Sequence, residues 1–134
     1  MFHAIFVLAS LLAPAPRLDD RVEYWKRVLH LDQWRITVRL VQRHELEDGT
    51  QADIETDIAT KTASIRVLRE QDSDLPKHLA RADQQVTIAH EMVHLSKLVR
   101  LGQPYWQDES ATNAETDALL RQHHCWRELL VVER

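Results

Sequence analysis

Cysteine and glycine are scarce in this chain of 134 residues, and its 17 basic residues are outnumbered by 21 acidic ones; each of these features argues against a class of protein. The single cysteine, Cys125, excludes an intrachain disulfide and a cysteine-rich zinc site, so any zinc must be bound by histidine and carboxylate. The two glycines, Gly49 and Gly102, argue against a glycine-rich phosphate-binding loop. A net charge of −4 gives no reason to expect nucleic acid or an anionic membrane as a partner, because both are bound by basic patches.

The N-terminal apolar run, Ala4–Ala13, is far shorter than the ~20 residues that span a bilayer, so we expect no stable membrane span. Its length suits the core of a signal peptide, and Ala13-Pro14-Ala15 offers a small-x-small cleavage pattern. Two details oppose this interpretation: no Lys or Arg precedes the run, and Pro16 would follow the cut. Residues 1–17 are therefore either a signal peptide, which implies periplasmic or secreted protein, or an apolar N-terminal segment of a cytoplasmic protein.

The remaining residues, 18–134, are long enough for one hydrophobic core and too short for two. Apolar residues make up 44% of the sequence and charged residues 28%, which is ordinary for a globular domain. Strict alternation, as in Trp34, Ile36, Val38 and Leu40, indicates half-buried strands, and apolar residues at helical spacing indicate helices.

The order of these patterns predicts an α+β fold, with a helix followed by a small three-stranded sheet and two more helices. A turn at Asp48-Gly49 separates the first two strands, and a polar connection containing Pro76 precedes the second helix. Asp19 or Asp20 is the expected cap of the first helix, and Asp108 that of the last. The predicted helices are 18–31, 83–101 and 108–132, and the predicted strands are 33–42, 52–55 and 61–68.

Within the second predicted helix, the stretch TIAHEMVHLSK carries His90, Glu91 and His94. Positions i and i+4 of a helix share one face, so the two imidazoles point the same way, and the glutamate lies about 100° further round. This arrangement suits two nitrogen ligands on one zinc ion with a carboxylate beside its open side. The neighbouring residues are uncharged, and a bound cation would compensate three buried ionisable groups. The alternative is a hydrogen-bonded core network without metal.

The five residues His90-Glu91-Met92-Val93-His94 resemble the HExxH signature of zinc metallopeptidases. The wider arrangement, from Val22 to Leu120, is similar to the minimal gluzincins of small bacterial and phage proteins. The resemblance implies a zincin-like fold, one zinc ion per chain, Glu91 as general base and a peptide or protein substrate. It also implies a glutamate ligand from the closing helix.

The third ligand is either Glu115 or Glu109. If the last two helices form an antiparallel pair, residues equally distant from the turn face each other, which favours Glu115 opposite His94. Glu115 also lies on the same stripe as Ala111, Ala114 and Ala118, whose small side chains would let the helices approach closely. Glu109 lies in the first helical turn, where the helix dipole favours a carboxylate without any ligand role. The outer partner of the first histidine could be Asp117 or a backbone carbonyl.

Other conspicuous residues have simpler interpretations. Adjacent helical positions point about 100° apart, so His123, His124 and Cys125 cannot share one ion, and we expect a solvated helix end there. Tyr105 and Trp106 are either substrate contacts or the aromatic plug of a helix turn. The tryptophans expected in the core are Trp25, Trp34 and Trp126.

Two hypotheses for function follow. The first is a zinc peptidase in which an extended substrate pairs with the sheet edge along Lys61 to Leu68. The second is a zinc-binding regulatory or partner-docking module that hydrolyses nothing. Glu91 favours the first, because a purely structural site has no use for a base beside an open metal position.

Overall fold

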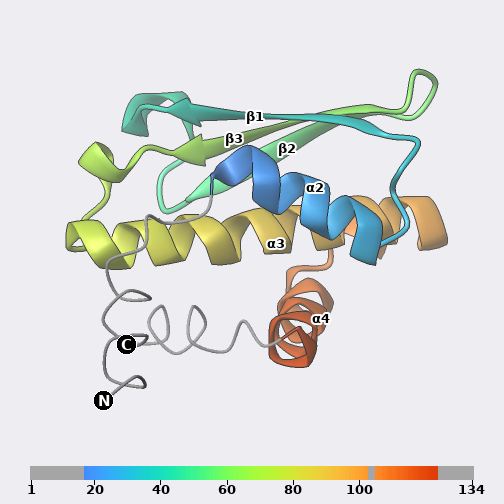
Figure 1. The fold of residues 1–134 in the computed structure, drawn as a ribbon. Coiled ribbons are helices and arrows are strands. Elements are labelled where there is room, and N and C mark those ends of the chain that lie inside the picture. The colour runs from blue at the N-terminus through green and yellow to red at the C-terminus, as the bar shows by residue number, and fades with distance from the viewer. Residues whose placement is uncertain (1–16, 103–104, 124–134) are drawn as a thin grey trace, which may run out of the picture.

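The computed structural model describes residues 17–102 and 105–123. It confirms the α+β class: one three-stranded sheet packs on helices (Figure 1). The helices are α2 (Leu18–Val28), α3 (Lys77–Leu101) and α4 (Glu109–Gln122), the strands are β1 (Arg35–Val41), β2 (Ala52–Asp57) and β3 (Thr62–Leu68), and the 3-10 turns are η1 (Arg43–Glu45), η2 (Glu70–Asp72) and η3 (Tyr105–Gln107). Residues 1–16 of the predicted signal peptide lie outside the described residues. His124, Cys125 and Trp126 also lie outside them.

The sheet has the order β1-β3-β2, with β3 in the centre. β1 runs parallel to β3, and β2 runs antiparallel to it. The alternating residues Ala63, Ile65 and Val67 of β3 are buried, as their spacing predicted. The expectation that a substrate pairs along Lys61 to Leu68 is wrong, because both sides of β3 are already hydrogen-bonded to neighbouring strands. Within the described ranges, the unpaired edges of the sheet are those of β1 and β2.

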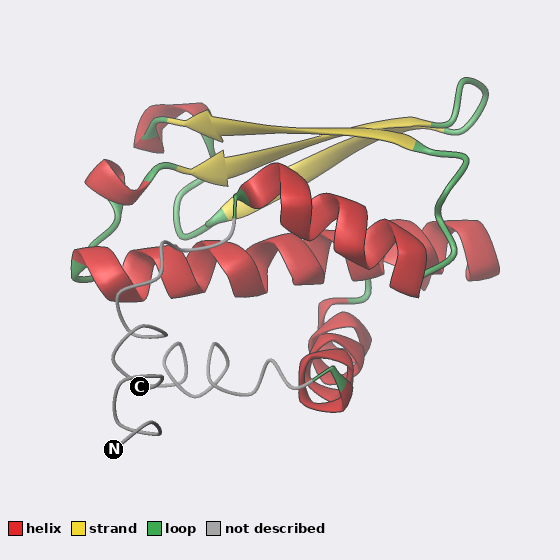
Figure 2. Cartoon of the chain, in the orientation of Figure 1, coloured by secondary structure: helices red, strands yellow, loops and turns green. Residues whose placement is uncertain are grey.

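The helices lie on one side of the sheet in two layers (Figure 2). α2 and α3 lie directly against the sheet, and α4 contacts α3 on the side away from it (Figure 1). α3 is therefore enclosed by the sheet, α2 and α4, and successive positions such as Ile88-Ala89 and Met92-Val93 are all buried. Trp25 and Trp34 belong to the same core, with exposed fractions of 0% and 6%, as predicted.

Each helix differs from prediction at one end or at its cap, and α2 also ends at Val28 rather than at residue 31. α3 begins at Lys77 rather than near residue 83, because the polar side chains assigned to a loop form the largely exposed first turns of the helix. α2 begins at Leu18 after Arg17, so Asp19 and Asp20 lie in the first turn, where the helix dipole favours carboxylates, rather than at the cap. α4 ends at Gln122 instead of continuing to residue 132.

Two predicted helix ends are confirmed. The side chain of Asp108 caps α4 by accepting a hydrogen bond of 3.1 Å from the backbone N–H of Ala111. Gly102 ends α3 with a positive φ of 71°, a conformation that glycine adopts without strain. Among the described residues, no helix has both the length and the apolar character needed to cross a membrane.

Candidate metal centre

Three side chains that can bind a metal converge where α3 meets the start of α4. His94 Nε2 lies 2.7 Å from one carboxylate oxygen of Glu109, and His90 Nε2 lies 3.0 Å from the other. The two imidazole Nε2 atoms lie 3.1 Å apart. Among the described residues this is the one group of three potential ligands whose donor atoms all lie within 4.8 Å of one another. The structure thus places His90 and His94 together, as the helical spacing predicted.

The ring of His94 is held by a carbonyl group. Its Nδ1 lies 2.7 Å from the backbone oxygen of Trp106, in η3. A carbonyl oxygen can only accept, so Nδ1 carries the proton and donates it. In neutral His94 the lone pair is then on Nε2, which points toward Glu109 and His90. The expected backbone carbonyl partner is therefore present, but on the second histidine of the motif rather than the first, while Asp117 forms an ion pair with Arg121 instead.

This convergence of atoms fits a cation. A lone pair on His94 Nε2 facing a carboxylate oxygen at 2.7 Å is repulsive unless a proton or a metal ion lies between them. Zinc bound by nitrogen and oxygen at about 2.0–2.2 Å in a tetrahedral geometry separates its ligand atoms by roughly 3.3–3.5 Å. The observed separations of 2.7–3.1 Å require only a small outward adjustment to reach that spacing.

Burial also favours the ligand form of the first histidine. The pKa of His90 is lowered, mainly by burial of its ring and then by the neighbouring His94, and these effects outweigh the opposing pull of Glu109. A neutral imidazole is the form that binds zinc. The side chain of Glu109 is 66% exposed, so the cluster is open to solvent on that side. Catalytic zinc sites keep such an open position, whereas structural sites are closed.

Glu91 lies beside the cluster but is not part of it. Only 7% of its surface is exposed, and no described residue forms a hydrogen bond or ion pair with its carboxyl group. The pKa of Glu91 is raised to about 8, first by burial and then by the negative charges of Glu109 and Asp53. A divalent cation in the cluster would favour the ionised form and lower that pKa again.

Two cavities meet at Glu91 and Glu109. One has a volume of about 380 Å³ and is lined by β2 and by the loop before α4; the other, of about 400 Å³, extends toward the start of β2 and the middle of α3. The residues lining the first include Ala52, Asp53 and Ile54 of β2. The candidate centre is therefore the middle of a cleft that runs alongside a free strand edge.

The structure places Glu109 next to the histidines, and it places Glu115 elsewhere. Glu115 Oε1 accepts a hydrogen bond of 2.6 Å from Arg100 Nη2, at the end of α3. The preference for Glu115 assumed that α3 and α4 are antiparallel neighbours, but α4 is seen nearly end-on where α3 lies across the view (Figure 1). The helices cross, so residues at equal distances from the turn diverge.

The stripe that α4 buries was also misassigned. The three alanines expected to face α3, Ala111, Ala114 and Ala118, are exposed. The buried residues of the helix are instead Thr112, Thr116 and Leu120. Glu109 lies three positions before Thr112 and shares its face. In the sequence this face is marked by two threonines and a leucine at four-residue spacing, and threonine is a polar residue that is mostly exposed in proteins.

The remaining predicted residues are not ligands in the described structure. His123 was expected at a solvated helix end, but its Nδ1 lies 2.8 Å from the hydroxyl of Tyr24, and its ring packs against Trp25. Trp106 is only 9% exposed and belongs to the core, which favours the aromatic plug over a substrate contact. The side chain of Tyr105 lies outside what the structure describes.

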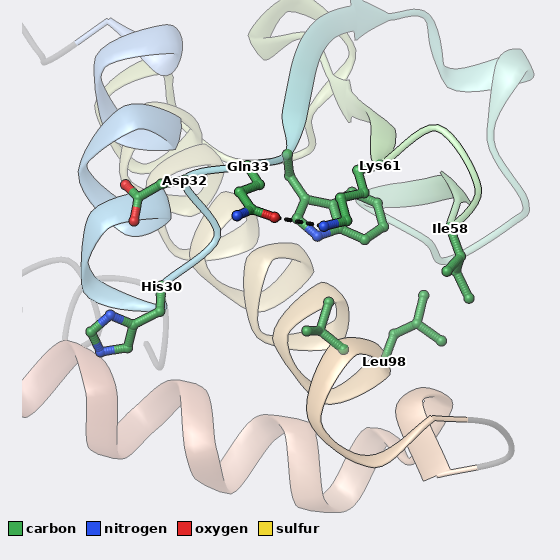
Figure 3. Close-up of a pocket in the computed structure, with 8 residues that line it drawn as sticks. His30, Asp32, Gln33, Ile58, Lys61 and Leu98 are labelled. Atoms are coloured by element: carbon green, nitrogen blue, oxygen red, sulfur yellow. Dashed lines mark hydrogen bonds between the residues drawn. The ribbon is translucent and has the colours of Figure 1, made fainter.

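A further cavity, of about 420 Å³, lies at the C-terminal end of α3 (Figure 3). Its labelled lining includes Lys61, whose Nζ donates a hydrogen bond of 2.6 Å to Gln33 Oε1, and apolar side chains such as Ile58 and Leu98. No described residues there form a group of three metal ligands. Among the described residues, the group that could hold a metal ion is therefore the histidine cluster.

No family model matches the chain, and comparisons with curated proteins and with solved structures returned no significant match.

Proposed function

We propose that this protein is a zinc-dependent metallopeptidase whose metal ligands are His90, His94 and Glu109. The observation that carries the proposal is the convergence of two imidazole nitrogens and one carboxylate in an open cleft beside the buried, unpartnered Glu91. Three protein ligands with one open position are typical of catalytic zinc. The proposal includes a zincin-like fold, supported by the HExxH helix lying between a small sheet and a closing helix.

Zinc bound at this site would act as a Lewis acid that polarises the substrate carbonyl and lowers the pKa of water toward ~7. Glu91 would take a proton from the water as its oxygen attacks the carbonyl carbon, and would pass that proton to the amine nitrogen as the C–N bond breaks. The carbonyl of Trp106 fixes the tautomer of His94 and orients its Nε2 toward the centre.

A peptide substrate would pair with β2 rather than β3. In the part of the chain that the structure describes, β2 pairs with β3 on one side and with no strand on the other, and its residues Ala52–Ile54 line the same cavity as Glu91 and His94. An extended chain added to a free edge makes backbone hydrogen bonds that depend little on its sequence. This arrangement would carry the scissile bond past the metal centre.

The non-hydrolytic alternative makes a different demand on the site. A module that only binds zinc needs the three ligands but no carboxyl group held beside the open position. Burying an unpartnered carboxyl group is unfavourable unless the site uses it or compensates it. The environment of Glu91 therefore supports the enzyme over the binding module.

The test begins with metal content and hydrolysis in the purified full chain. We expect about one zinc per chain by elemental analysis, loss of that zinc in His90→Ala and His94→Ala, and cleavage of a denatured, fluorescently labelled protein by the native chain only. His44→Ala is the matched control, because His44 is an exposed histidine outside the cleft. Zinc binding without any cleavage would favour the binding module, and stoichiometric zinc in the His90→Ala,His94→Ala double variant would remove the site altogether.

A further inference from the structure

A buried lysine lies close to the metal centre. Lys97, three residues after His94 on α3, is only 3% exposed. Lysine is almost never fully buried unless its charge is paired. No carboxylate among the described residues pairs with Lys97, and its two hydrogen-bond acceptors are a carbonyl and a hydroxyl. Because burying an ammonium group without a carboxylate partner is unfavourable, the contacts of Lys97 should explain why it is there.

Both acceptors lie at the start of α4. Lys97 Nζ donates to the backbone oxygen of Asp108 at 3.3 Å and to Thr112 Oγ1 at 3.1 Å. Asp108 is the N-cap of α4 and directly precedes Glu109. A single ammonium group thus joins the helix that carries the two histidines to the turn that carries the carboxylate.

Thr112 connects this contact to the histidine. Its hydroxyl hydrogen is donated to the carbonyl of Asp108 at 2.7 Å, so its lone pairs are free to accept from Lys97. The same oxygen lies 3.4 Å from His94 Nδ1. Thr112 is completely buried, so water does not compete for these bonds.

The two carbonyl groups nearest to Glu109 in this network are both held from α3. His94 donates to the carbonyl of Trp106, and Lys97 donates to that of Asp108. Hydrogen bonds from α3 therefore fix the backbone at Trp106 and at Asp108, three residues and one residue before Glu109. The side chain of Glu109 is largely exposed, so its position depends on this backbone and on its contacts with His90 and His94.

The positive charge of Lys97 does not stabilise the N-terminus of α4, where its two acceptors lie. The N-terminus of a helix carries partial positive charge, which favours anions and disfavours a cation. A methionine could fill a similar volume without that penalty. The ammonium is therefore better explained by the two hydrogen bonds it directs than by packing.

We propose that Lys97, acting through Asp108 and Thr112, is a positioning residue that holds Glu109 against His90 and His94 for metal binding. The inference rests on the proposed metal centre but not on peptidase activity. It predicts that removing the ammonium weakens metal binding by way of Glu109 and leaves the two histidines competent.

The experiment measures zinc affinity by chelator competition, and the visible spectrum of the Co²⁺-substituted full chain, for Lys97→Met, Glu109→Ala and the double variant. We expect Lys97→Met to lower zinc affinity about 10–100-fold, the range typical of losses in the outer shell of a metal site. Its Co²⁺ spectrum should shift toward that of Glu109→Ala. In the Glu109→Ala background, Lys97→Met should have no further effect. Lys77→Met, at an exposed lysine on the same helix, is the control and should match the native chain.

A folded Lys97→Met variant with native zinc affinity would overturn the proposal. An equal loss in both backgrounds would also overturn it, because the lysine would then act on the fold as a whole. If Lys97→Met does not fold, Thr112→Val and Thr112→Ser decide the question: the serine should retain native affinity and the valine should lose it, and equal affinities would reject the network. If the native chain binds zinc but cleaves nothing, the peptidase proposal is rejected and this test of Lys97 still applies. If the native chain binds no metal, both proposals are rejected.

Discussion

The first and second turns of α4 each present a glutamate to α3, with very different partners. Glu109 lies between two imidazole nitrogens, whereas Glu115 meets the guanidinium of Arg100. Exposure does not explain the difference, since the side chain of Glu109 is 66% exposed and that of Glu115 only 38%. The partner is what separates a candidate ligand from a surface ion pair.

The charge balance of the two turns differs in the same way. Arg100 supplies the positive charge that the Glu115 carboxylate needs, and the pair is complete without any other group. Near Glu109, the basic side chain that the described hydrogen bonds include is that of Lys97, and it is directed at the carbonyl of Asp108 rather than at the carboxylate. A bound cation would therefore balance the carboxylate of Glu109 in the first turn, whereas Arg100 already balances Glu115 in the second.

The largest effect is expected beside the first turn, at Glu91. Glu91→Gln should lower kcat for peptide hydrolysis by about 10²–10⁴-fold with zinc content unchanged, because it removes a base but no ligand. The measurement is the rate of cleavage of a labelled protein alongside elemental analysis. Glu115→Gln is the matched control and should retain native activity. A native rate in Glu91→Gln would show that the base lies elsewhere, and a loss of zinc would make Glu91 a ligand.

Direct comparison of the two turns gives the next effect. Glu109→Ala should lower zinc affinity by more than the 10–100-fold typical of outer-shell losses, because it removes a ligand. Glu115→Ala should bind zinc like the native chain. Competitive titration of both variants against a chelator measures the contrast. The opposite result would return the third ligand to Glu115 and would mean that the helices pack as an antiparallel pair.

The sequence predicted those parts of the molecule that depend on local spacing. The alternation in β3 and the spacing of His90 and His94 are properties of neighbouring residues, and both were predicted correctly. In β1 the predicted alternation fails at its end, where Leu40 is 51% exposed and Val41 is buried instead. Asp108 and Gly102 were recognised in the same way, because each helix end is set by a few residues around it.

The parts that the sequence did not predict depend on distant segments. The central place of β3 is set by pairing with β1 and β2, and no residue within β3 specifies it. The choice between Glu109 and Glu115 depends on the angle at which α4 crosses α3. Buried Thr112 and Lys97 indicated that angle, but polar side chains inside a helix interface are not recognisable as buried from one sequence.

Zinc should also stabilise the fold, and the size of this stabilisation should differ between variants of the first and second turns of α4. A ligand that binds only the folded state at 100 times its dissociation constant stabilises that state by about 2.7 kcal/mol. The native chain and Glu115→Ala should both gain roughly this much in the free energy of unfolding, measured by urea denaturation with and without zinc. Glu109→Ala should gain clearly less at the same zinc concentration. Equal gains in all three proteins would place the zinc away from α4.

The smallest effect is expected in the second turn. The side chains of Arg100 and Glu115 are 48% and 38% exposed, and exposed ion pairs contribute roughly 0–1 kcal/mol because water and salt screen them. Glu115→Ala in the zinc-free chain should therefore lower the free energy of unfolding by less than about 1 kcal/mol. The difference should shrink further in 1 M salt, where the screening length is only about 3 Å. A loss well above 1 kcal/mol that persists in salt would show that Glu115 supports the packing of α4 on α3, and the two turns would then be parts of one structural unit rather than a metal centre and a surface contact.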